Sequence, residues 1–448
     1  MKSHIFREYD IRGIFPGELN DETVHKLGLA IGTYYNNNGA GRISVGRDCR
    51  LSSPDISKWL IDGLMESGMV VVDVEMVPTP LLYYSLHQLD VHGGIQITGS
   101  HNPPEFNGFK VCLGTASLYG DEIQKIREIC ESGRFDHGKG ALEKADVVDS
   151  YIQFIERNIQ PGLTKRTVVI DAGNGVGGPV AVEIYKRMGF KVIPLFCEPD
   201  GSFPNHHPDP TIPKNLAAMI SKVDETAADL GIALDGDADR IGVVDHKGSI
   251  IWGDQLMIVF SRDLLTRHPG GKIIGEVKCS QVLYDDIESH GGQAIMWKAG
   301  HSLIKSKMKE EGALLAGEMS GHLFFAERYF GFDDAIYAGI RLLEILSRTK
   351  STLHELLGDI PKMLNTPEIR MECPEEKKFH IVADLVEEFK KEYKVIDVDG
   401  ARVIFDGGWG LVRASNTQPV LVLRFEASNE KRLEEIQKIF MEKLGKRL

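Results

Sequence analysis

The strongest constraint on the fold is an alternation of short apolar runs and helical patterns that occurs three times along the chain. A helical pattern at residues 53–67 lies between two apolar runs of the first block. Alternating strands and helices favour parallel or mixed sheets covered by helices. We therefore expect three similar α/β units. The apolar runs of the three blocks lie at residues 43–45 and 69–72, then 168–170, 192–193 and 232–234, then 272–274, 294–296 and 313–315.

The last part of the chain departs from this pattern. A helical pattern at residues 375–393 is followed by short strands with Asp-Gly turns and by a final helix. In that helix Leu433, Ile436, Phe440 and Leu444 recur at helical spacing, which predicts one buried face. We therefore expect a smaller α+β domain at the C-terminus. The predicted domains span residues 1–146, 147–249, 250–362 and 363–448.

Composition argues against several classes of protein. The formal net charge of −13 argues against a nucleic-acid partner, because such binding relies on a basic surface. No apolar run approaches the roughly 18 residues of a membrane span. Six cysteines lie apart, without a C-x-x-C pair, as in reduced cytoplasmic proteins. We expect a cytoplasmic protein without a membrane partner, and the oligomeric state stays open.

The first distinctive motif is TGSHNPPEFNGFK at residues 98–110, which follows an apolar run at residues 94–98. Glycine, asparagine and two prolines turn the backbone there, so Ser100 stands where a strand meets a turn. A hydroxyl in that position is a candidate nucleophile or phosphate carrier. A polar turn that merely contains serine is the simpler alternative.

The second motif, DGDADR at residues 235–240, also follows an apolar run. Asp235, Asp237 and Asp239 alternate in a tight loop and can converge on one hard cation such as Mg²⁺, which prefers oxygen ligands. An EF-hand is excluded, because Arg240 and His246 stand where that loop needs Gly and Glu. The alternative is a solvated acidic turn.

Two weaker motifs follow. In GEMSGH at residues 317–322, Glu318 can accept hydrogen bonds from sugar hydroxyls, Ser320 can donate or accept, and His322 can exchange a proton. In RASNT at residues 413–417, Arg413 offers a charged planar fork suited to phosphate oxygens. A hairpin turn would explain the second of these equally well. Its further polar donors are Ser415, Asn416 and Thr417.

The four motifs occur once each and in this order, and that series resembles the α-D-phosphohexomutase superfamily, specifically its bifunctional phosphomannomutase/phosphoglucomutase branch. The resemblance extends over essentially the whole chain. It includes FREYDIRG at residues 6–13, KCS at 278–280 and KAGHSLIK at 298–305. It implies four domains around a central cleft, the fourth a mobile lid.

The resemblance also implies the activity, which is the reversible conversion of hexose 1-phosphate to hexose 6-phosphate, with mannose, glucose or both. Ser100 would carry the phosphoryl group, and a hexose 1,6-bisphosphate would be intermediate and activator. Mg²⁺ would be held by Ser100, Asp235, Asp237 and Asp239. The implied catalytic residues are Ser100, His101, Lys110, Arg12, Arg240 and Lys278. The implied substrate-binding residues are Tyr9, His301, Glu318, Ser320, His322, Arg413, Ser415, Asn416 and Thr417.

Three other interpretations stay open at this point. A magnesium-dependent sugar phosphatase would use the same serine and cation. A nicotinamide-dependent oxidoreductase would use GNGVGG at residues 173–178, which matches G-x-G-x-x-G, although the charge of Asp171 would oppose a pyrophosphate. A non-enzymatic binding protein would leave the serine and aspartates without purpose. The histidines of PNHHPDP at residues 204–210 suggest a metal site, but neighbours on an extended segment point apart, which favours a structural role.

Overall fold

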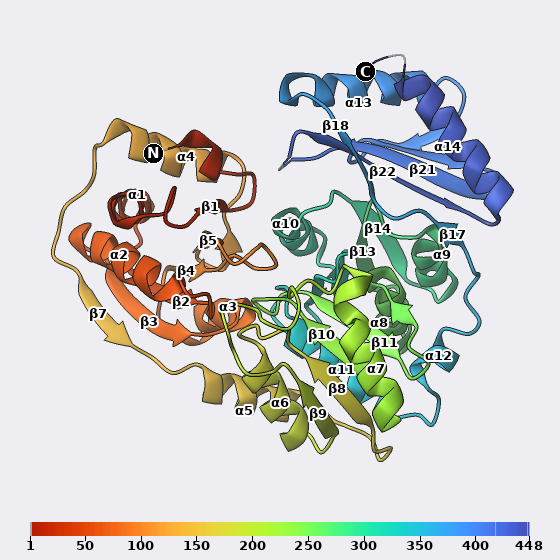
Figure 1. Cartoon of the computed structure of the whole chain (residues 1–448), viewed down its shortest axis with the longest axis horizontal. Coiled ribbons are helices and arrows are strands. Elements are labelled where there is room, and N and C mark those ends of the chain that lie inside the picture. The colour runs from red at the N-terminus through yellow and green to blue at the C-terminus, as the bar shows by residue number, and fades with distance from the viewer. Residues whose placement is uncertain (1, 417, 446, 448) are drawn as a thin grey trace.

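The computed structural model describes residues 2–416, 418–445 and 447 of the 448-residue chain. The described residues form four sheets that follow one another along the chain. Figure 1 shows them in an arc, with the first sheet at the left, the second at the bottom, the third at the right and the last at the upper right.

The first sheet is mixed and has the strand order β1-β5-β4-β2-β3-β7, with β6 paired to β5. Its helices α1 and α2 pack so closely that a Cβ added to Gly28 on α1 would lie 2.5 Å from the Leu60 carbonyl oxygen on α2. The strands are β1 (Ile11–Ile14), β2 (Arg42–Arg47), β3 (Val70–Met76), β4 (Gly93–Ile97), β5 (Phe106–Leu113), β6 (Ala116–Ser117) and β7 (Ala141–Lys144). The helices are α1 (Asp21–Asn37), α2 (Ser53–Glu66), α3 (Thr79–Gln88) and α4 (Asp121–Ser132).

The second and third sheets follow the same plan. The second has the order β12-β11-β10-β8-β9 and the third β14-β13-β15-β16. Elements of the second unit are α5 (Val148–Asn158), β8 (Thr167–Asp171), α6 (Gly178–Arg187), β9 (Lys191–Leu195), α7 (Ala217–Thr226), β10 (Leu230–Leu234), β11 (Ile241–Asp245) and β12 (Ile250–Ile251). Those of the third are α8 (Gly253–Arg267), β13 (Lys272–Glu276), α9 (Gln281–Ser289), β14 (Gln293–Trp297), α10 (His301–Glu311), β15 (Leu315–Gly317), β16 (Leu323–Phe325), α11 (Ala335–Ser347) and α12 (Leu353–Leu356).

The three sheets share a common centre. The orders β5-β4-β2-β3, β11-β10-β8-β9 and β16-β15-β13-β14 correspond strand by strand. In each, the last three strands are parallel and the first is antiparallel. The equivalent strands β4, β10 and β15 run directly into the three motifs predicted from the sequence. The prediction of three similar α/β units with mixed sheets is confirmed.

The fourth unit is α+β, as expected. Its antiparallel sheet has the order β17-β22-β21-β20-β19, with β18 paired to β22. In the last helix Ile436, Phe440 and Leu444 are buried against this sheet, and Leu433 is partly buried. The elements are β17 (Leu364–Asn365), β18 (Ile369–Glu372), α13 (Glu375–Phe389), β19 (Lys394–Ile396), β20 (Ala401–Phe405), β21 (Gly408–Ala414), β22 (Val420–Ala427) and α14 (Glu430–Leu444).

Two predicted elements have different bounds in the structure. The strand predicted at residues 313–315 begins only at Leu315, because Gly312 ends α10 in the left-handed conformation (φ +64°). The helix predicted to reach Tyr393 ends at Phe389, and residues 390–393 form turns. The predicted domain boundaries stay predictions. Among the described residues, no helix is both long and apolar enough to cross a membrane.

Candidate active site

The serine motif forms a tight loop between β4 and β5. Ser100 has a left-handed backbone (φ +48°), which is uncommon for a residue with a side chain. Its side chain is only 3% exposed. The Ser100 Oγ donates to Asp235 Oδ2 at 2.9 Å and lies 3.1 Å from His101 Nδ1. Burial is the main reason why the pKa of His101 lies well below its usual value, so this imidazole is neutral.

The three aspartates of the second motif converge. They are buried, and one oxygen of each can lie within 4.8 Å of the others. The Asp235 Oδ1 accepts from the Asp239 and Arg240 amides at 3.0 and 3.1 Å, which fixes the loop. The Asp237 Oδ2 accepts from Thr79 Oγ1 at 2.5 Å. Burial and the neighbouring carboxylates of Asp239 and Asp237 raise the pKa of Asp235 well above its usual value.

A lysine from the first sheet balances part of this negative charge. Lys110, on β5, donates to Asp237 Oδ2 at 2.8 Å and also pairs with Asp239 Oδ2. Although burial opposes ionisation, these carboxylates hold the pKa of Lys110 well above its usual value. Lys110 is therefore a fixed cation in this structure rather than a free base. In the sequence Lys110 lies more than 125 positions before Asp237 and Asp239, and only folding brings the three residues together.

The third motif lies beside the second. His322 Nδ1 donates to Glu318 Oε2 at 2.6 Å, and His322 Nε2 lies 3.3 Å from Asp239 Oδ1. In the neutral imidazole Nε2 can instead accept from Arg240 Nε at 3.2 Å. Burial and Arg240 oppose protonation, but Asp239 and Glu318 outweigh them and raise the pKa of His322 to about 9. The Ser320 hydroxyl lies 3.4 Å from His322 Nδ1.

Glu318 connects this group to the loop before α10. Its Oε1 accepts from the Gly300 amide at 2.7 Å. At the start of α10, the ring of His301 lies near those of Tyr9 and His322, with centroid distances of 6.0 and 5.6 Å. Burial, assisted by Lys305, holds the pKa of His301 well below its usual value.

The fourth motif reaches the same loop from the other side. The Arg413 Nε donates to Asp399 Oδ2 at 2.8 Å, and that oxygen also accepts from the Ala299 amide at 3.1 Å. The Asn416 amide donates to the Tyr9 hydroxyl at 2.8 Å, and Tyr9 donates to the Ala299 carbonyl at 3.2 Å. Residues of the first, third and fourth units therefore meet around residues 299–301. Thr417 lies outside the described residues.

The remaining predicted residues are placed as follows. Lys278 donates to Glu368 Oε2 at 3.3 Å, and although burial opposes it, Glu276 and Glu368 raise the pKa of Lys278. Arg12, on β1, pairs with Asp10. The Ser415 carbonyl accepts from Lys378 Nζ at 2.6 Å.

Comparison with known proteins decides the family. Models of the phosphoglucomutase/phosphomannomutase alpha/beta/alpha domains I, II and III match residues 3–137, 149–248 and 252–364, and the model of the C-terminal domain matches residues 368–443. The phosphomannomutase/phosphoglucomutase of Pseudomonas aeruginosa is 48% identical over 445 residues, which cover 99% of this chain and 96% of that protein. This chain belongs to the phosphoglucomutase/phosphomannomutase family. The resemblance stated from the sequence is thereby confirmed.

Other members of the family agree with this assignment. The phosphoglucomutase of Neisseria gonorrhoeae is 46% identical over 443 residues, which cover 97% of this chain and 95% of that protein. A solved structure of a phosphoglucomutase/phosphomannomutase family protein from Burkholderia thailandensis has a TM-score of 0.93 and 42% identity. The match covers 99% of this chain and 97% of the Burkholderia chain. The similarity therefore extends over all four units.

The acidic loop of this family member is suited to a metal ion. The Asp237 Oδ1 is buried and accepts no hydrogen bond from any described residue, and the only group that faces Asp239 Oδ1 among the described residues is His322 Nε2 at 3.3 Å. Leaving a buried carboxylate oxygen without a partner is costly, and a divalent cation would satisfy it. The donor set consists of oxygens only, as hard cations prefer. The three aspartates can thus hold a metal ion.

The glycine motif at residues 173–178 packs against other loops in this structure. A Cβ at Gly175 would lie 2.8 Å from the Gly236 carbonyl oxygen, and one at Gly177 would lie 2.5 Å from the Ala238 Cβ. These glycines let the loop support the three-aspartate loop at close range. The Asp171 carboxylate pairs with His206 Nε2 at 3.0 Å, and neither His206 nor His207 joins a metal-binding group among the described residues. The interpretations of residues 173–178 as a dinucleotide site and of residues 204–210 as a metal site thus lose their support.

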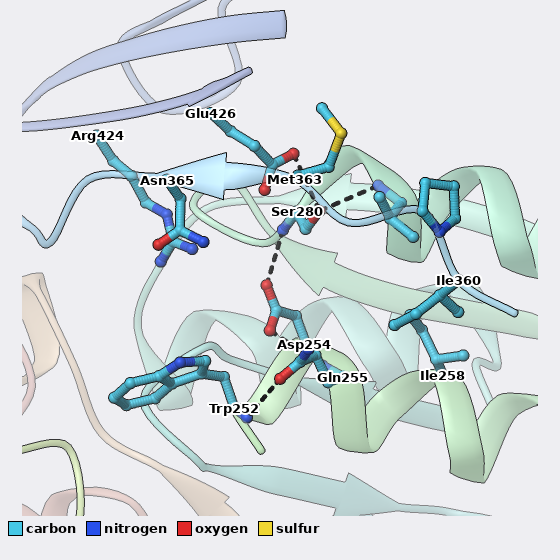
Figure 2. Close-up of a pocket in the computed structure, with 12 residues that line it drawn as sticks. Trp252, Asp254, Gln255, Ile258, Ser280, Ile360, Met363, Asn365, Arg424 and Glu426 are labelled. Carbon is cyan, nitrogen blue, oxygen red and sulfur yellow. Dashed lines mark hydrogen bonds between the residues drawn. The ribbon is translucent and has the colours of Figure 1, made fainter. Parts of the chain in front are cut away.

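A pocket of about 70 Å³ lies away from Ser100, where the fourth unit meets the third. Figure 2 shows Arg424 and Asn365 side by side at one end of it, with Trp252 below them. Ser280 donates from its amide to Asp254 Oδ2 at 2.9 Å and from its hydroxyl to Glu426 Oε1 at 3.0 Å. These contacts join the two units.

Sequence reasoning missed several residues that hold the site together. Asp48 and Arg50 follow β2 directly and contact the serine loop, and Asp399 and Lys378 hold the fourth motif. The signal that found the motifs, a polar residue at the end of a buried strand, also applies to Asp48 and Arg50. Asp399 and Lys378 carry no such signal, because they reach the site from a turn and a helix.

Proposed function

We propose that this protein interconverts hexose 1-phosphates and hexose 6-phosphates of both mannose and glucose, with Ser100 as the phosphoryl carrier. The single observation that carries the proposal is the 2.9 Å hydrogen bond from Ser100 Oγ to Asp235 in the buried three-aspartate group. A nucleophilic hydroxyl beside a cation-binding group is the arrangement that phosphoryl transfer requires. The printed names of the relatives, phosphomannomutase/phosphoglucomutase and phosphoglucomutase, support the substrate class.

The proposed reaction uses two transfers. Phosphorylated Ser100 gives its phosphoryl group to O6 of a hexose 1-phosphate, so that a P–O6 bond forms and the P–Oγ bond breaks, while the O6 proton passes to a nearby base and Ser100 Oγ takes up a proton. The resulting hexose 1,6-bisphosphate turns over within the site. Its 1-phosphoryl group then returns to Ser100 Oγ, O1 takes up a proton, and hexose 6-phosphate leaves. Such chemistry depends mainly on positioning and on charge neutralisation.

Charge neutralisation would come from the metal ion and from fixed cations. Mg²⁺, held by Asp235, Asp237 and Asp239 together with the group on Ser100, would withdraw charge from the transferring phosphoryl group. Lys110 supplies a permanent positive charge beside Asp237 and Asp239. The neutral His101, 3.1 Å from Ser100 Oγ, can accept the serine proton when the phosphoryl group returns.

Sugar recognition explains how one site accepts two sugars in two orientations. Glu318 and Ser320 would bind O3 and O4, neighbouring hydroxyls that exchange places when the sugar turns. A site that reads O3 and O4 is indifferent to O2, where glucose and mannose differ. His322, with its raised pKa, can donate a proton to a leaving oxygen in the same place.

The distal phosphate would bind on the opposite side, to Arg413, Ser415 and Asn416. Arg413 supplies a charged fork suited to phosphate oxygens. Its Nε is engaged by Asp399, so the Nη groups remain the natural phosphate donors. Lys278 adds a second cation, and its raised pKa keeps it charged.

A ³¹P NMR time course tests the proposal. Mannose 1-phosphate and then glucose 1-phosphate are mixed with the protein, Mg²⁺ and a trace of glucose 1,6-bisphosphate. Growth of a 6-phosphate signal from both sugars is expected, and omission of Mg²⁺ should stop it. Release of inorganic phosphate without isomerised sugar would instead identify a phosphatase. No change of either sugar would overturn the proposal.

A further inference from the structure

A buried arginine holds the backbone of the serine loop. Arg50 is 1% exposed, and its two terminal nitrogens donate to four backbone carbonyls of the loop. The Nη2 group donates to Ser100 at 2.7 Å and to Asn102 at 2.5 Å. The Nη1 group donates to Pro103 at 2.6 Å and to Phe106 at 2.9 Å. One planar fork thus fixes the loop on both sides of its turn.

The guanidinium is itself held in place. Its Nε lies 3.2 Å from Asp48 Oδ2, and its Cζ lies 5.2 Å from the centre of the Phe203 ring. Asp48 Oδ2 also accepts from the Thr98 hydroxyl at 2.8 Å and from the Gly99 amide at 3.1 Å. The carboxylate therefore connects the end of β4, the loop and Arg50 into one unit.

The Ser100 carbonyl has two supports. Arg50 donates to it, and Gly236 lies so close that an added Cβ would be 2.4 Å from this oxygen. The left-handed backbone of Ser100 costs free energy and persists only where its surroundings enforce it. The supports act on the backbone and leave the side chain free to react.

Phosphorylation would remove the hydrogen bond from the Ser100 side chain to Asp235, whereas the bond from the Ser100 amide to Thr98 Oγ1 at 2.8 Å would remain. The hydroxyl hydrogen that Ser100 donates to Asp235 is lost when Oγ carries a phosphoryl group. We propose that Arg50 is a positioning residue that keeps Ser100 in the same place before and after each transfer, because its bonds go to carbonyls that the reaction does not alter. This inference rests on the proposed function.

Lysine cannot replace this fork. An ammonium group has three donors on one nitrogen and cannot serve four carbonyls in one plane. In Arg50→Lys the loop should move when Ser100 is phosphorylated. A misplacement of about 1 Å can lower the rate of a positioned reaction by about 100-fold. Bisphosphate should also escape before it returns its phosphoryl group, so the variant should need more added bisphosphate.

The test compares Arg50→Lys with Arg166→Lys. Arg166 is also buried, at 6% exposure, and donates to the Leu346, Thr349 and Ser351 carbonyls, none of which belongs to the candidate site. Both variants are assayed for Tm, kcat, KM for glucose 1-phosphate and the concentration of glucose 1,6-bisphosphate that gives half-maximal activity. Both should lose stability, so Tm alone does not separate them.

We expect Arg50→Lys to lower kcat by about 100-fold with KM within about twofold of wild type, and to raise the bisphosphate requirement at least about tenfold. Arg166→Lys should keep the wild-type kcat, KM and bisphosphate requirement. Equal kinetic constants in the two variants would overturn the inference. If Arg50→Lys does not fold, Asp48→Asn, which loosens the arginine without removing it, should show the same selective fall of kcat, and an unchanged kcat would overturn it. Absence of turnover in wild type and Arg166→Lys alike would instead refute the proposed function.

Discussion

The first three units and the fourth are built into the molecule in different ways. Besides a core of its own, the first unit contributes α3 to one large hydrophobic core that it shares with the second and third units. Rings from all three meet there, with Tyr84 5.3 Å from Tyr151 and 6.0 Å from Phe330. The fourth unit has a core of its own.

The attachment of the fourth unit is small by comparison. A minor apolar cluster joins Val277 of the third unit to Trp409 and Leu411. Polar contacts add to it, with Arg402 donating to the Val277 and Cys279 carbonyls at 2.6 and 2.7 Å. Because it shares so little apolar surface, the fourth unit can move against the others at lower cost than they can move against one another.

This difference matches the division of labour in the site. Ser100, the aspartates, Glu318 and His322 belong to the common body, where positions are fixed by packing. Arg413 and Asn416 belong to the separately cored unit. We therefore expect substitutions of the reacting groups in the body to act on kcat, and substitutions in the fourth unit or at its contacts with the body to act on KM. The following predictions test this division, beginning with the largest effect.

Replacement of the serine should have the largest effect. Ser100→Ala removes the phosphoryl carrier, and loss of a catalytic serine can lower kcat by about 10⁶-fold. The Tm should stay close to wild type, because the backbone supports from Arg50 and Gly236 remain. Coupled assays for glucose 6-phosphate and thermal unfolding measure both. Near-normal turnover by phosphate-free variant protein would contradict the role of Ser100.

Arg413→Ala tests the fourth unit. Loss of a charged hydrogen bond to the distal phosphate costs about 1.5–3 kcal/mol, which corresponds to a rise in KM of about 10- to 150-fold. The value of kcat at saturation should change much less. Steady-state kinetics with mannose 1-phosphate separate the two constants. A fall in kcat with KM unchanged would place Arg413 with the reacting groups and break the proposed division.

The pH dependence tests His322 within the body. Because its pKa is raised to about 9, the residue is charged at neutral pH and loses its proton as the pH rises through about 9. Its contribution to stability is complete below the ordinary pKa of about 6.5 and is lost over the same rise, since the folded state binds the proton more tightly. We expect kcat to fall about fivefold between pH 9 and 10, as the protonated fraction of His322 falls.

The control for this prediction is His322→Gln, which cannot titrate. Between pH 6.5 and 9 the Tm of this variant should fall less than that of the wild type, because His322 no longer contributes to the fall. A wild-type kcat that stays constant up to pH 10, or a variant with the same Tm profile as wild type, would contradict the assignment.

Tyr9→Phe should have the smallest effect and bears most directly on the comparison. The change removes the hydroxyl that joins the first unit to Asn416 of the fourth, at 2.8 Å, and keeps the ring beside His301. A neutral hydrogen bond contributes about 0.5–1.5 kcal/mol, so KM should rise by about 2- to 10-fold. Asn416→Ala should raise KM at least as much, because it also removes a proposed phosphate donor, and the double variant should add nothing to Asn416→Ala alone. Additive effects would show that the two residues act separately.

Much of the fold could be predicted because its signals are local. The apolar runs at residues 232–234 and 294–296 lie within β10 and β14, where burial on a sheet selects such residues. The predicted bounds of strands and helices were less accurate where backbone conformation decides them. At Gly312 the left-handed turn ends α10, so β15 begins only at Leu315. The candidate site was found in outline, because Ser100, the aspartates and Glu318 each follow a buried strand. Asp399 and Lys378 could not be found this way, since neither follows such a run.

The sequence by itself therefore determined the three repeated units, the different fourth unit and the polar residues at the ends of β4, β10 and β15. Alternation and turn chemistry are short-range effects, and they are written in neighbouring residues. Only the tertiary structure decided that Ser100 reaches Asp235, that Lys110 is held by two aspartates and that Arg50 supports the serine backbone. These contacts join residues that are tens to more than a hundred positions apart, and they form because packing between units brings loops together that no local pattern relates.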